Sequence, residues 1–317
     1  MNEAPQRAVT PAALERLDRL ASERGLELLA DAPLGPLTTL RVGGAADRMA
    51  TVRSRTDLLA ALRCAHDAGV PSFMLGNGSD LVVADAGIRG LVIRNRAREV
   101  RVDGGRVEAD SGAAMAMLVK RCTTEGLAGL EFGISIPGTL GGAVWANAGA
   151  HGGDMAGILV SARAWDPATD DEHVLDNAAC GFSYRESRFK HSGEAVLGAT
   201  VELDTGDPDE IAARVDANQA QRRATQPLAD QNAGSVFRNP PGDHAGRLID
   251  AAGLKGRRVG SAEVSGLHAN FITCDRGGRA ADVRALGDLV RSTVADTFGV
   301  ELQYEIEFVG AWPEAGE

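Results

Sequence analysis

Aromatic residues are scarce in this chain of 317 residues, where Phe, Trp and Tyr together make up 4%. Proteins that bind single-stranded nucleic acid stack bases on aromatic side chains, so this composition disfavours that class. A basic excess is also missing, because 44 Asp and Glu against 33 Lys and Arg give a formal net charge of −11. Affinity for a phosphate backbone comes mainly from clustered Lys and Arg. An anionic ligand of this protein would therefore need a local basic pocket.

Cysteine is rare too, and its placement excludes two kinds of scaffold. The four cysteines lie far apart, with no Cys-x-x-Cys pair and no nearby set of histidines, so we predict neither a metal site nor a disulfide framework. Long apolar runs are missing. The longest stretch without a charged residue, 132–153, holds seven Gly and one Pro and is expected to form loops rather than a membrane span. Met1–Thr10 has no apolar core, so no signal peptide is expected, and the chain is typical of a cytoplasmic α/β protein.

Hydrophobic periodicity and capping residues predict three successive α/β units. The chain is long enough for about two domains by the usual rule of one per roughly 150 residues. The predicted units span 1–98, 99–206 and 207–317. Helices are expected at 11–24, 56–69, 113–125, 207–222 and 283–298. Strands are expected at 50–53, 72–75, 91–94, 158–165, 196–203 and 301–308, with a hairpin at 100–108.

Glycine is in excess, with 39 copies, and many of them fall in two segments. The first, Leu75–Leu81, follows an expected strand, and its glycines would let backbone N–H groups approach a phosphate. It matches neither common phosphate-loop template, so a plain strand-to-helix turn is the alternative. The second, 133–153, mixes glycines with aliphatic residues and suits a backbone packed flat against a large planar ligand. A buried connection with several turns is the alternative there.

Short motifs follow one another between Thr39 and Gly310 in an order that is specific as a set. They are Thr39-Leu-Arg-Val-Gly-Gly44, Gly76-Asn-Gly-Ser79, Ile136-Pro-Gly-Thr-Leu-Gly-Gly142, Asn147-Ala-Gly149, Ser183-Tyr-Arg-Glu-Ser187, Ala233-Gly-Ser-Val-Phe-Arg-Asn239, Gly253-Leu-Lys255 and His268-Ala-Asn-Phe271. This series resembles the UDP-N-acetylenolpyruvoylglucosamine reductase family. Only 50 residues separate Arg185 from Ser235, which is similar to the subclass that lacks an inserted substrate-capping loop.

The resemblance implies a fold and a reaction. The fold would be a vanillyl-alcohol-oxidase-type FAD-binding domain of two α/β subdomains, followed by a C-terminal α/β substrate-binding domain. The reaction would be the reduction of UDP-N-acetylglucosamine enolpyruvate to UDP-N-acetylmuramate in peptidoglycan precursor synthesis, with NADPH as co-substrate. Hydride would pass from NADPH through FAD to the enolpyruvyl β-carbon. Covalent-flavin relatives often carry histidine in the first glycine loop, whereas Ser79-Asp80 stands here, so non-covalent FAD is expected.

Three residues match the family's catalytic positions. Ser235 is implied as the donor of a proton to the α-carbon, Arg185 as the partner of the enolpyruvyl carboxylate, and Glu305 as an aid to polarisation and proton delivery. Without the resemblance, the residue patterns favour other interpretations. Ser235 would be a backbone cap, Arg185 half of a surface ion pair, and Glu305 part of the solvated face of the last strand.

The same motifs imply binding residues. The implied cofactor contacts are Arg41, Gly43, Gly44, Gly76, Asn77, Gly78, Ser79, Ile136, Pro137, Gly138, Thr139, Gly141, Gly142 and Asn147. The implied substrate contacts are Tyr184, Arg238, Asn239, Lys255 and His268. We expect Arg185, Arg238 and Lys255 to be the chief cations of the local basic pocket. Leu267 stands where many relatives carry a lysine, which puts one phosphate contact in doubt.

Two other functions fit parts of this sequence. One is a different non-covalent FAD oxidoreductase of the vanillyl-alcohol oxidase type, which would oxidise an alcohol or a sugar. The other is a non-catalytic nucleotide-binding protein. Neither nucleic acid nor a membrane is expected as a partner, and the sequence leaves the oligomeric state open.

Overall fold

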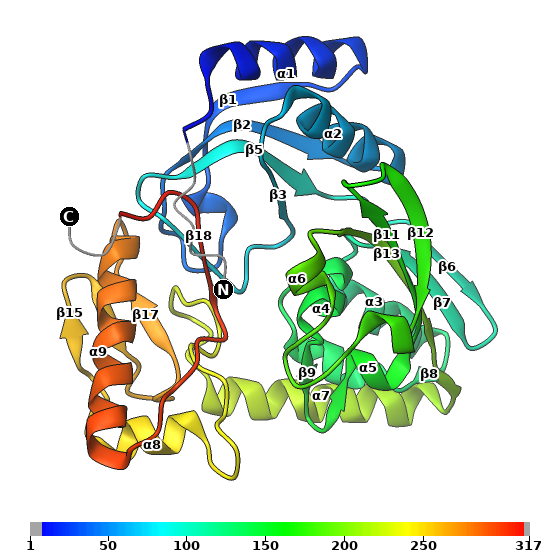
Figure 1. Cartoon of the computed structure of the whole chain (residues 1–317). Coiled ribbons are helices and arrows are strands. Elements are labelled where there is room, and N and C mark those ends of the chain that lie inside the picture. Colours follow the sequence, from blue (N-terminus) through cyan, green and yellow to red (C-terminus); the bar gives the residue numbers. More distant parts are fainter. Residues whose placement is uncertain (1–7, 314–317) are drawn as a thin grey trace.

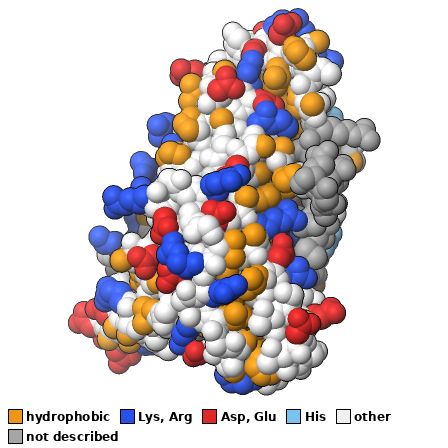
Figure 2. Space-filling model, turned by 90° about the vertical axis from the view of Figure 1, so that its left-hand side faces the viewer, with side chains coloured by type: hydrophobic (Ala, Val, Ile, Leu, Met, Phe, Trp, Pro, Cys, Tyr) orange, Lys and Arg blue, Asp and Glu red, His pale blue; other side chains and the backbone are white. Residues whose placement is uncertain are grey.

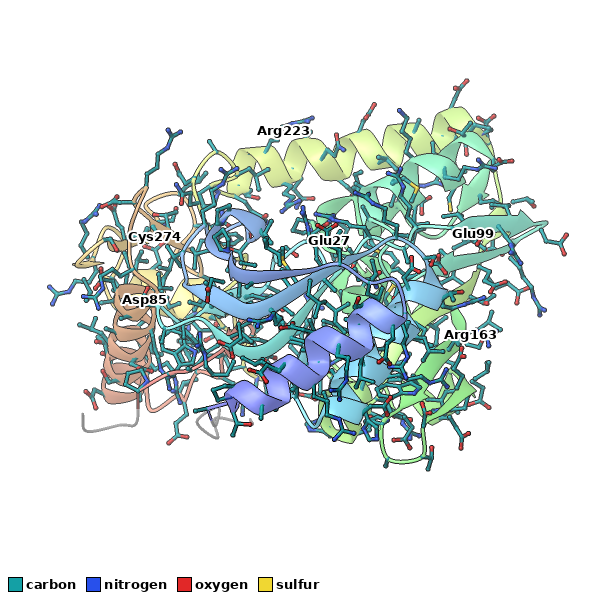
Figure 3. The ribbon with its side chains drawn as sticks, turned by 90° about the horizontal axis from the view of Figure 1, so that it is seen from above. Glu27, Asp85, Glu99, Arg163, Arg223 and Cys274 are labelled. Atoms are coloured by element: carbon teal, nitrogen blue, oxygen red, sulfur yellow. The ribbon has the colours of Figure 1, made fainter. Side chains whose placement is uncertain are left out.

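The first unit is a four-stranded sheet with two helices on its outer face (Figures 1 and 3). The computed structural model describes residues 8–313. Its sheet has the order β1-β2-β5-β3, in which β2, β5 and β3 run parallel. The elements are α1 (Pro11–Glu23), β1 (Leu28–Pro33), β2 (Ala45–Val52), α2 (Arg55–Ala68), β3 (Ser72–Leu75) and β5 (Ile88–Asn95). Leu17, Leu58 and Ile93 are fully buried between helices and sheet.

The second unit is a five-stranded antiparallel sheet of order β12-β11-β13-β7-β6. Its strands are β6 (Val100–Asp103), β7 (Arg106–Asp110), β11 (Leu159–Asp166), β12 (Asp171–Asp176) and β13 (Ala195–Glu202). The shorter elements are α3 (Met115–Thr124), β8 (Leu127–Ala128), α4 (Leu140–Ala146), β9 (Gly149–Ala150), β10 (Gly153–Asp154), α5 (Met155–Ile158), α6 (Phe189–Ser192) and β14 (Asp204–Thr205). Leu118 of α3 and Val144 of α4 share a core with the sheet. The predicted hairpin is confirmed, and it turns at Gly104, whose φ is 55°.

The third unit packs a long helix against a small antiparallel sheet (Figure 1). Its elements are α8 (Ala245–Ala251), β15 (Arg258–Val259), β16 (Ala262–Val264), β17 (Ile272–Cys274) and α9 (Ala280–Phe298). The apolar series of α9 is confirmed, because Val283, Leu286, Val290 and Val294 are buried. Two backbone N–H groups at the start of α9 donate to Asp85, which lies beside this helix (Figure 3). Lys and Arg side chains intermingle with Asp and Glu on the face of Figure 2, so no large field of one sign forms there.

Two connections join the units. Helix α7 (Pro208–Thr225) begins at the predicted Asp207 cap and runs beneath the second unit, where Arg214 pairs with Glu131 at 2.8 Å. The proposed third unit thus starts with a helix that contacts the second. Near the other end of the chain, β18 (Glu307–Val309) pairs in parallel with β4 (Leu81–Val83), which follows β3. The chain therefore returns to the first unit at its end.

Two predicted segments were wrong in part. The segment 132–153 is not all loop, because Leu140 and Val144 bury one side of α4, and Asn147 ends that helix with a φ of 43°. The segment 301–308 is not one strand: only Glu307–Val309 joins a sheet, and Tyr304 makes an isolated bridge to Phe237. Strands β1 and β12 were missed. Their mostly exposed residues gave no apolar alternation.

None of the helices within residues 8–313 combines the length and apolarity that crossing a bilayer requires. The prediction that Met1–Thr10 is not a signal peptide concerns a segment whose first seven residues lie outside the described residues. The α/β fold class is confirmed by the alternation of helices and strands in all three units.

Candidate active site

A cavity of about 2050 Å³ is lined by segments from all three units. The first unit contributes 76–81, the second contributes most of the residues between 135 and 151, and the third contributes 228–235. Glu305, Glu307 and Val309 line it from the returning C-terminal segment. This volume exceeds the roughly 300–1,000 Å³ of an ordinary small-ligand pocket, so the cavity has room for a dinucleotide and a second ligand.

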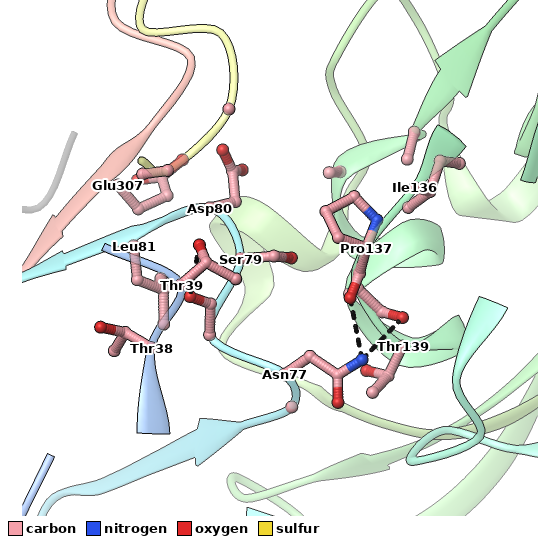
Figure 4. A pocket seen from close by; sticks show the side chains of 18 of the residues that line it. Thr38, Thr39, Asn77, Ser79, Asp80, Leu81, Ile136, Pro137, Thr139 and Glu307 are labelled. Carbon is pink, nitrogen blue, oxygen red and sulfur yellow. Dashed lines mark hydrogen bonds between the residues drawn. The ribbon is translucent and has the colours of Figure 1, made fainter. Parts of the chain in front are cut away.

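Two glycine loops face each other across one part of this cavity (Figure 4). Asn77 ties them together, because its Nδ2 donates to the carbonyl oxygens of Pro137 at 2.9 Å and Gly138 at 3.2 Å. A Cβ placed on Gly76 would lie 2.6 Å from the Thr139 hydroxyl. The loops can therefore approach closely only with glycine at this position, and both present backbone and short side chains to the cavity. Such a wall fits a large flat cofactor like FAD.

The structure divides the predicted cofactor contacts into two groups. Those that line the cavity are Arg41, Gly76, Asn77, Gly78, Ser79, Ile136, Pro137, Gly138, Thr139, Gly141 and Gly142. Gly43, Gly44 and Asn147 are not among the lining residues, and other contacts explain them. A Cβ on Gly43 would lie 2.6 Å from Val83, and one on Gly44 would overlap the carbonyl oxygen of Asp85. Asn147 is buried and bridges the carbonyl of Ser183 to the N–H of Ala156.

The three predicted catalytic residues all line the cavity. Arg185 donates from Nε to Glu305 Oε1 at 2.6 Å and from Nη2 to the carbonyl of Gly149 at 2.8 Å. Its φ of 57° is unusual for a residue other than glycine, and the paired backbones of Ser183 and Glu186 hold this tight turn. The sequence interpretation of Arg185 as half of an ion pair is correct, but the pair is mostly buried at the cavity and not on the surface.

Ser235 and Glu305 are brought together by the backbone. The N–H of Glu305 donates to the carbonyl of Val236 at 2.8 Å, which places the segment of Glu305 beside that of Ser235. Ser235 is half-buried, and its hydroxyl has no hydrogen-bond partner among residues 8–313. A free hydroxyl thus lies on the cavity wall near the Arg185–Glu305 pair.

Sequence reasoning missed a second group of charges beside this pair. Lys190 Nζ lies 3.2 Å from Glu307 and 4.3 Å from the centre of the Trp145 ring. Asp80 also lines the cavity, next to Glu307 in Figure 4, and its carboxyl has no partner in the described part of the chain. Burial first, and then the charges of Glu305 and Glu307, raise the pKa of Asp80 well above its ordinary value. The position of Asp80 at the end of the first glycine loop was the available signal.

We expect the Asp80→Asn variant to be more stable than the wild type at neutral and alkaline pH. Because the pKa of Asp80 is raised in the folded protein, the folded state binds this proton more tightly than the unfolded chain does. The free energy of unfolding therefore falls as the pH rises from the ordinary Asp range through the raised pKa. Urea unfolding should show a larger gain for Asp80→Asn at about pH 8 than at about pH 5.

Asp216→Asn is the matched control for this measurement, since Asp216 is exposed on α7. It should change the stability little at either pH. A gain for Asp80→Asn that is equal at both pH values would contradict the assigned cause.

The predicted substrate contacts lie outside the cavity lining. Arg238 pairs with Glu186 at 2.7 Å, and Lys255 pairs with Asp250 at 2.8 Å. The other three contacts are engaged as follows: Tyr184 lies under the Arg185 guanidinium, the Asn239 side chain accepts from the N–H of Ala245 near the start of α8, and His268 packs on Phe271. Burial lowers the pKa of His268, which favours its neutral form.

Other cations line the cavity. Arg41, Arg94, Arg96 and Arg276 do so, and none of them pairs with a carboxylate within residues 8–313. Arg41 belongs to a quoted motif, whereas Arg94, Arg96 and Arg276 do not, so the basic pocket is formed partly by arginines that no motif indicated. Within the described part of the chain, no group of three or more His, Cys, Asp or Glu is arranged to hold a metal ion.

Two protein-family models match the chain. The model described as an FAD binding domain matches residues 46–171. The model described as the UDP-N-acetylenolpyruvoylglucosamine reductase C-terminal domain matches residues 226–309. The two matches cover the glycine loops on one side and Ser235 and Glu305 on the other.

Similar proteins agree with these models over nearly the whole length. The UDP-N-acetylenolpyruvoylglucosamine reductase of Moorella thermoacetica is 44% identical over 286 residues, which cover 90% of this chain and 94% of the relative. UDP-N-acetylenolpyruvoylglucosamine reductase 2 of Symbiobacterium thermophilum is 42% identical over 302 residues, which cover 94% of this chain and 97% of the relative. The crystal structure of the Thermus caldophilus reductase is 34% identical with a TM-score of 0.76, covering 91% of this chain and 99% of that one. The chain therefore belongs to the UDP-N-acetylenolpyruvoylglucosamine reductase family.

Proposed function

We propose that this chain reduces UDP-N-acetylglucosamine enolpyruvate to UDP-N-acetylmuramate with NADPH, as a cytoplasmic step of peptidoglycan precursor synthesis. The observation that carries the proposal is that Arg185, Ser235 and Glu305 line the same cavity as the two glycine loops. FAD, when bound there, supplies hydride to the β-carbon of the enolpyruvyl group. The chain itself must then hold the substrate carboxylate, polarise the double bond and protonate the α-carbon.

The two glycine loops would hold the cofactor without a covalent bond. Ser79 and Asp80 occupy the end of the first loop. Covalent attachment of the flavin through this loop would need a histidine there. Short side chains and free backbone N–H groups suit the phosphates and the flat ring system of FAD. Acid precipitation of the purified protein should therefore release all of its yellow colour into the supernatant.

Arg185 would bind the enolpyruvyl carboxylate. Its Nε and Nη2 are already engaged by Glu305 and Gly149, so the guanidinium plane is fixed. The remaining N–H donors, on Nη1 and Nη2, are free to take a carboxylate. As electron density moves into that carboxylate during hydride transfer, the fixed positive charge stabilises it.

Ser235 would give the proton to the α-carbon. A hydroxyl is a weak acid in water, and it can act only when the acceptor is strongly basic and the geometry is fixed. The bond between the Glu305 N–H and the Val236 carbonyl fixes this part of the wall. The free hydroxyl of Ser235 leaves it available to a ligand, and Glu305 would help to supply the next proton.

An anaerobic stopped-flow experiment in two stages tests the proposed function. NADPH should first bleach the flavin absorbance, and UDP-N-acetylglucosamine enolpyruvate should then restore it. Bleaching without recovery would indicate another FAD oxidoreductase, and an absence of bleaching would indicate a non-catalytic nucleotide-binding protein.

A further inference from the structure

A second cavity, of about 330 Å³, shares Arg94 and Arg96 with the large one. Half of its lining residues are arginines, because Arg53 and Arg98 join these two, and no acidic residue lines it. The sheet gathers them: β2 and β5 run parallel, and Val52 pairs with Asn95. Arg53 and Arg96 follow these paired residues directly, so both leave the sheet at the same edge. We call this the arginine cavity.

The charges of the arginine cavity are not compensated by the protein. None of the four arginines forms an ion pair with a carboxylate in the part of the chain that the structure describes, whereas Arg24, Arg48 and Arg63 each pair with an aspartate. Burial first, and then the charges of Arg94 and Arg53, lower the pKa of Arg96. The Nε of Arg94 is buried without a hydrogen-bond partner. Uncompensated like charges and an orphaned donor both cost free energy, which a bound anion would offset.

Helix α3 adds to the positive potential at the same place. Its N-cap residue, Ala114, lines the arginine cavity and has no side chain that can cap the helix. Backbone N–H groups at a helix start favour anions. Gly112 also lines the cavity, and a Cβ there would overlap the carbonyl oxygen of Ala97. This position therefore requires glycine, and no side chain covers its backbone.

We propose that the arginine cavity is a phosphate-binding site. Arg96 connects it to the cofactor loops, because its Nη1 donates to Asn77 Oδ1 at 2.9 Å, and Asn77 in turn holds Pro137 and Gly138. The phosphate can come from two sources: the diphosphate of FAD in the adjoining cavity, or a free phosphate-bearing anion. The first source rests on the proposed function, since it needs FAD in the large cavity.

The test compares anion and flavin binding in four proteins: the wild type, the Arg94→Gln/Arg96→Gln and Arg53→Gln/Arg98→Gln double variants, and Arg101→Gln. Arg101 is the matched control, because it is exposed and pairs with Glu99 outside the cavity. Inorganic phosphate is titrated against chloride at constant ionic strength, and the melting temperature is read for flavin-free and FAD-loaded protein. The affinities for FAD and for riboflavin, which has no phosphate, are measured by fluorescence quenching.

We expect phosphate to raise the melting temperature of the flavin-free wild type more than chloride does. Each double variant should bind phosphate at least about tenfold more weakly, the effect of losing one charge-assisted hydrogen bond, and Arg101→Gln should behave as the wild type. If FAD is the source, FAD-loaded protein no longer responds to phosphate, and Arg94→Gln/Arg96→Gln weakens FAD at least about tenfold but not riboflavin. If a free anion is the source, FAD-loaded protein still responds and the affinity for FAD is unchanged.

The proposal is overturned if phosphate acts no differently from chloride and the double variants keep the wild-type ratio of FAD to riboflavin affinity. None of these measurements depends on turnover. A failure of the proposed reduction would therefore be seen separately from a failure of this site.

Discussion

Ser235→Ala should slow reoxidation of the reduced flavoprotein by UDP-N-acetylglucosamine enolpyruvate by about 10²- to 10⁴-fold, the usual cost of a lost general acid. Reduction by NADPH should stay nearly unchanged, because that step needs no proton at the α-carbon. The hydroxyl of Ser235 has no partner among the described residues, so its removal breaks no hydrogen bond of the protein. Single-turnover stopped-flow absorbance separates the two half-reactions.

Ser292→Ala is the control for this experiment. Ser292 lies on α9 away from the cavity, and its hydroxyl only donates to the carbonyl of Leu289. Both half-reactions should match the wild type in that variant. Equal slowing of the two half-reactions in Ser235→Ala would remove Ser235 from the proton-donor role.

Arg185→Lys should lower kcat/KM for the enolpyruvyl substrate by about 10²-fold or more. Lysine keeps the positive charge but not the planar fork, so the simultaneous bonds to Glu305 and Gly149 cannot be kept. Loss of two charge-assisted hydrogen bonds to the substrate carboxylate, at roughly 1.5 kcal/mol each, corresponds to a factor of that size. Reduction by NADPH should be affected much less, since the enolpyruvyl carboxylate is absent from that step.

Arg188→Lys tests whether any loss is particular to Arg185. Arg188 lies three positions along the chain and also makes a two-pronged contact, with Glu194, but it does not line the cavity. The Arg188→Lys substitution should lower the thermal stability but leave the rate of reoxidation by the enolpyruvyl substrate nearly unchanged. A wild-type oxidative rate in Arg185→Lys would show that the fork is not needed.

The sequence predicted what depends on neighbours in the chain. The apolar series of α9 and the Asp207 cap of α7 are local signals, and both elements form as expected. The strand prediction for 301–308 was wrong because, among residues 8–313, the sheet partner of this segment is β4, more than two hundred residues earlier, and only Glu307–Val309 reaches it. A strand pattern read from side chains alone does not show whether a partner is available.

The same limit applied to the candidate site. Motifs located the glycine loops and the three catalytic candidates, but they did not show that Arg238 is neutralised by Glu186. Arg94 and Arg96 flank the buried Asn95 at the end of β5. In the sequence, this alternation is typical of an ordinary exposed strand face. Only the packing of that sheet edge against the start of α3 encloses them.

The parallel pairing of β18 with β4 has a consequence for the order in which the protein becomes functional. Chains fold from the N-terminus as they are synthesised, and Glu305 and Glu307, which line the cavity, are made after both glycine loops. The first two units can bury their own cores before these residues exist. A nascent chain can thus contain both glycine loops while the cavity still lacks these carboxylates, so we expect activity only after Glu305 and Glu307 have been made and β18 has paired with β4.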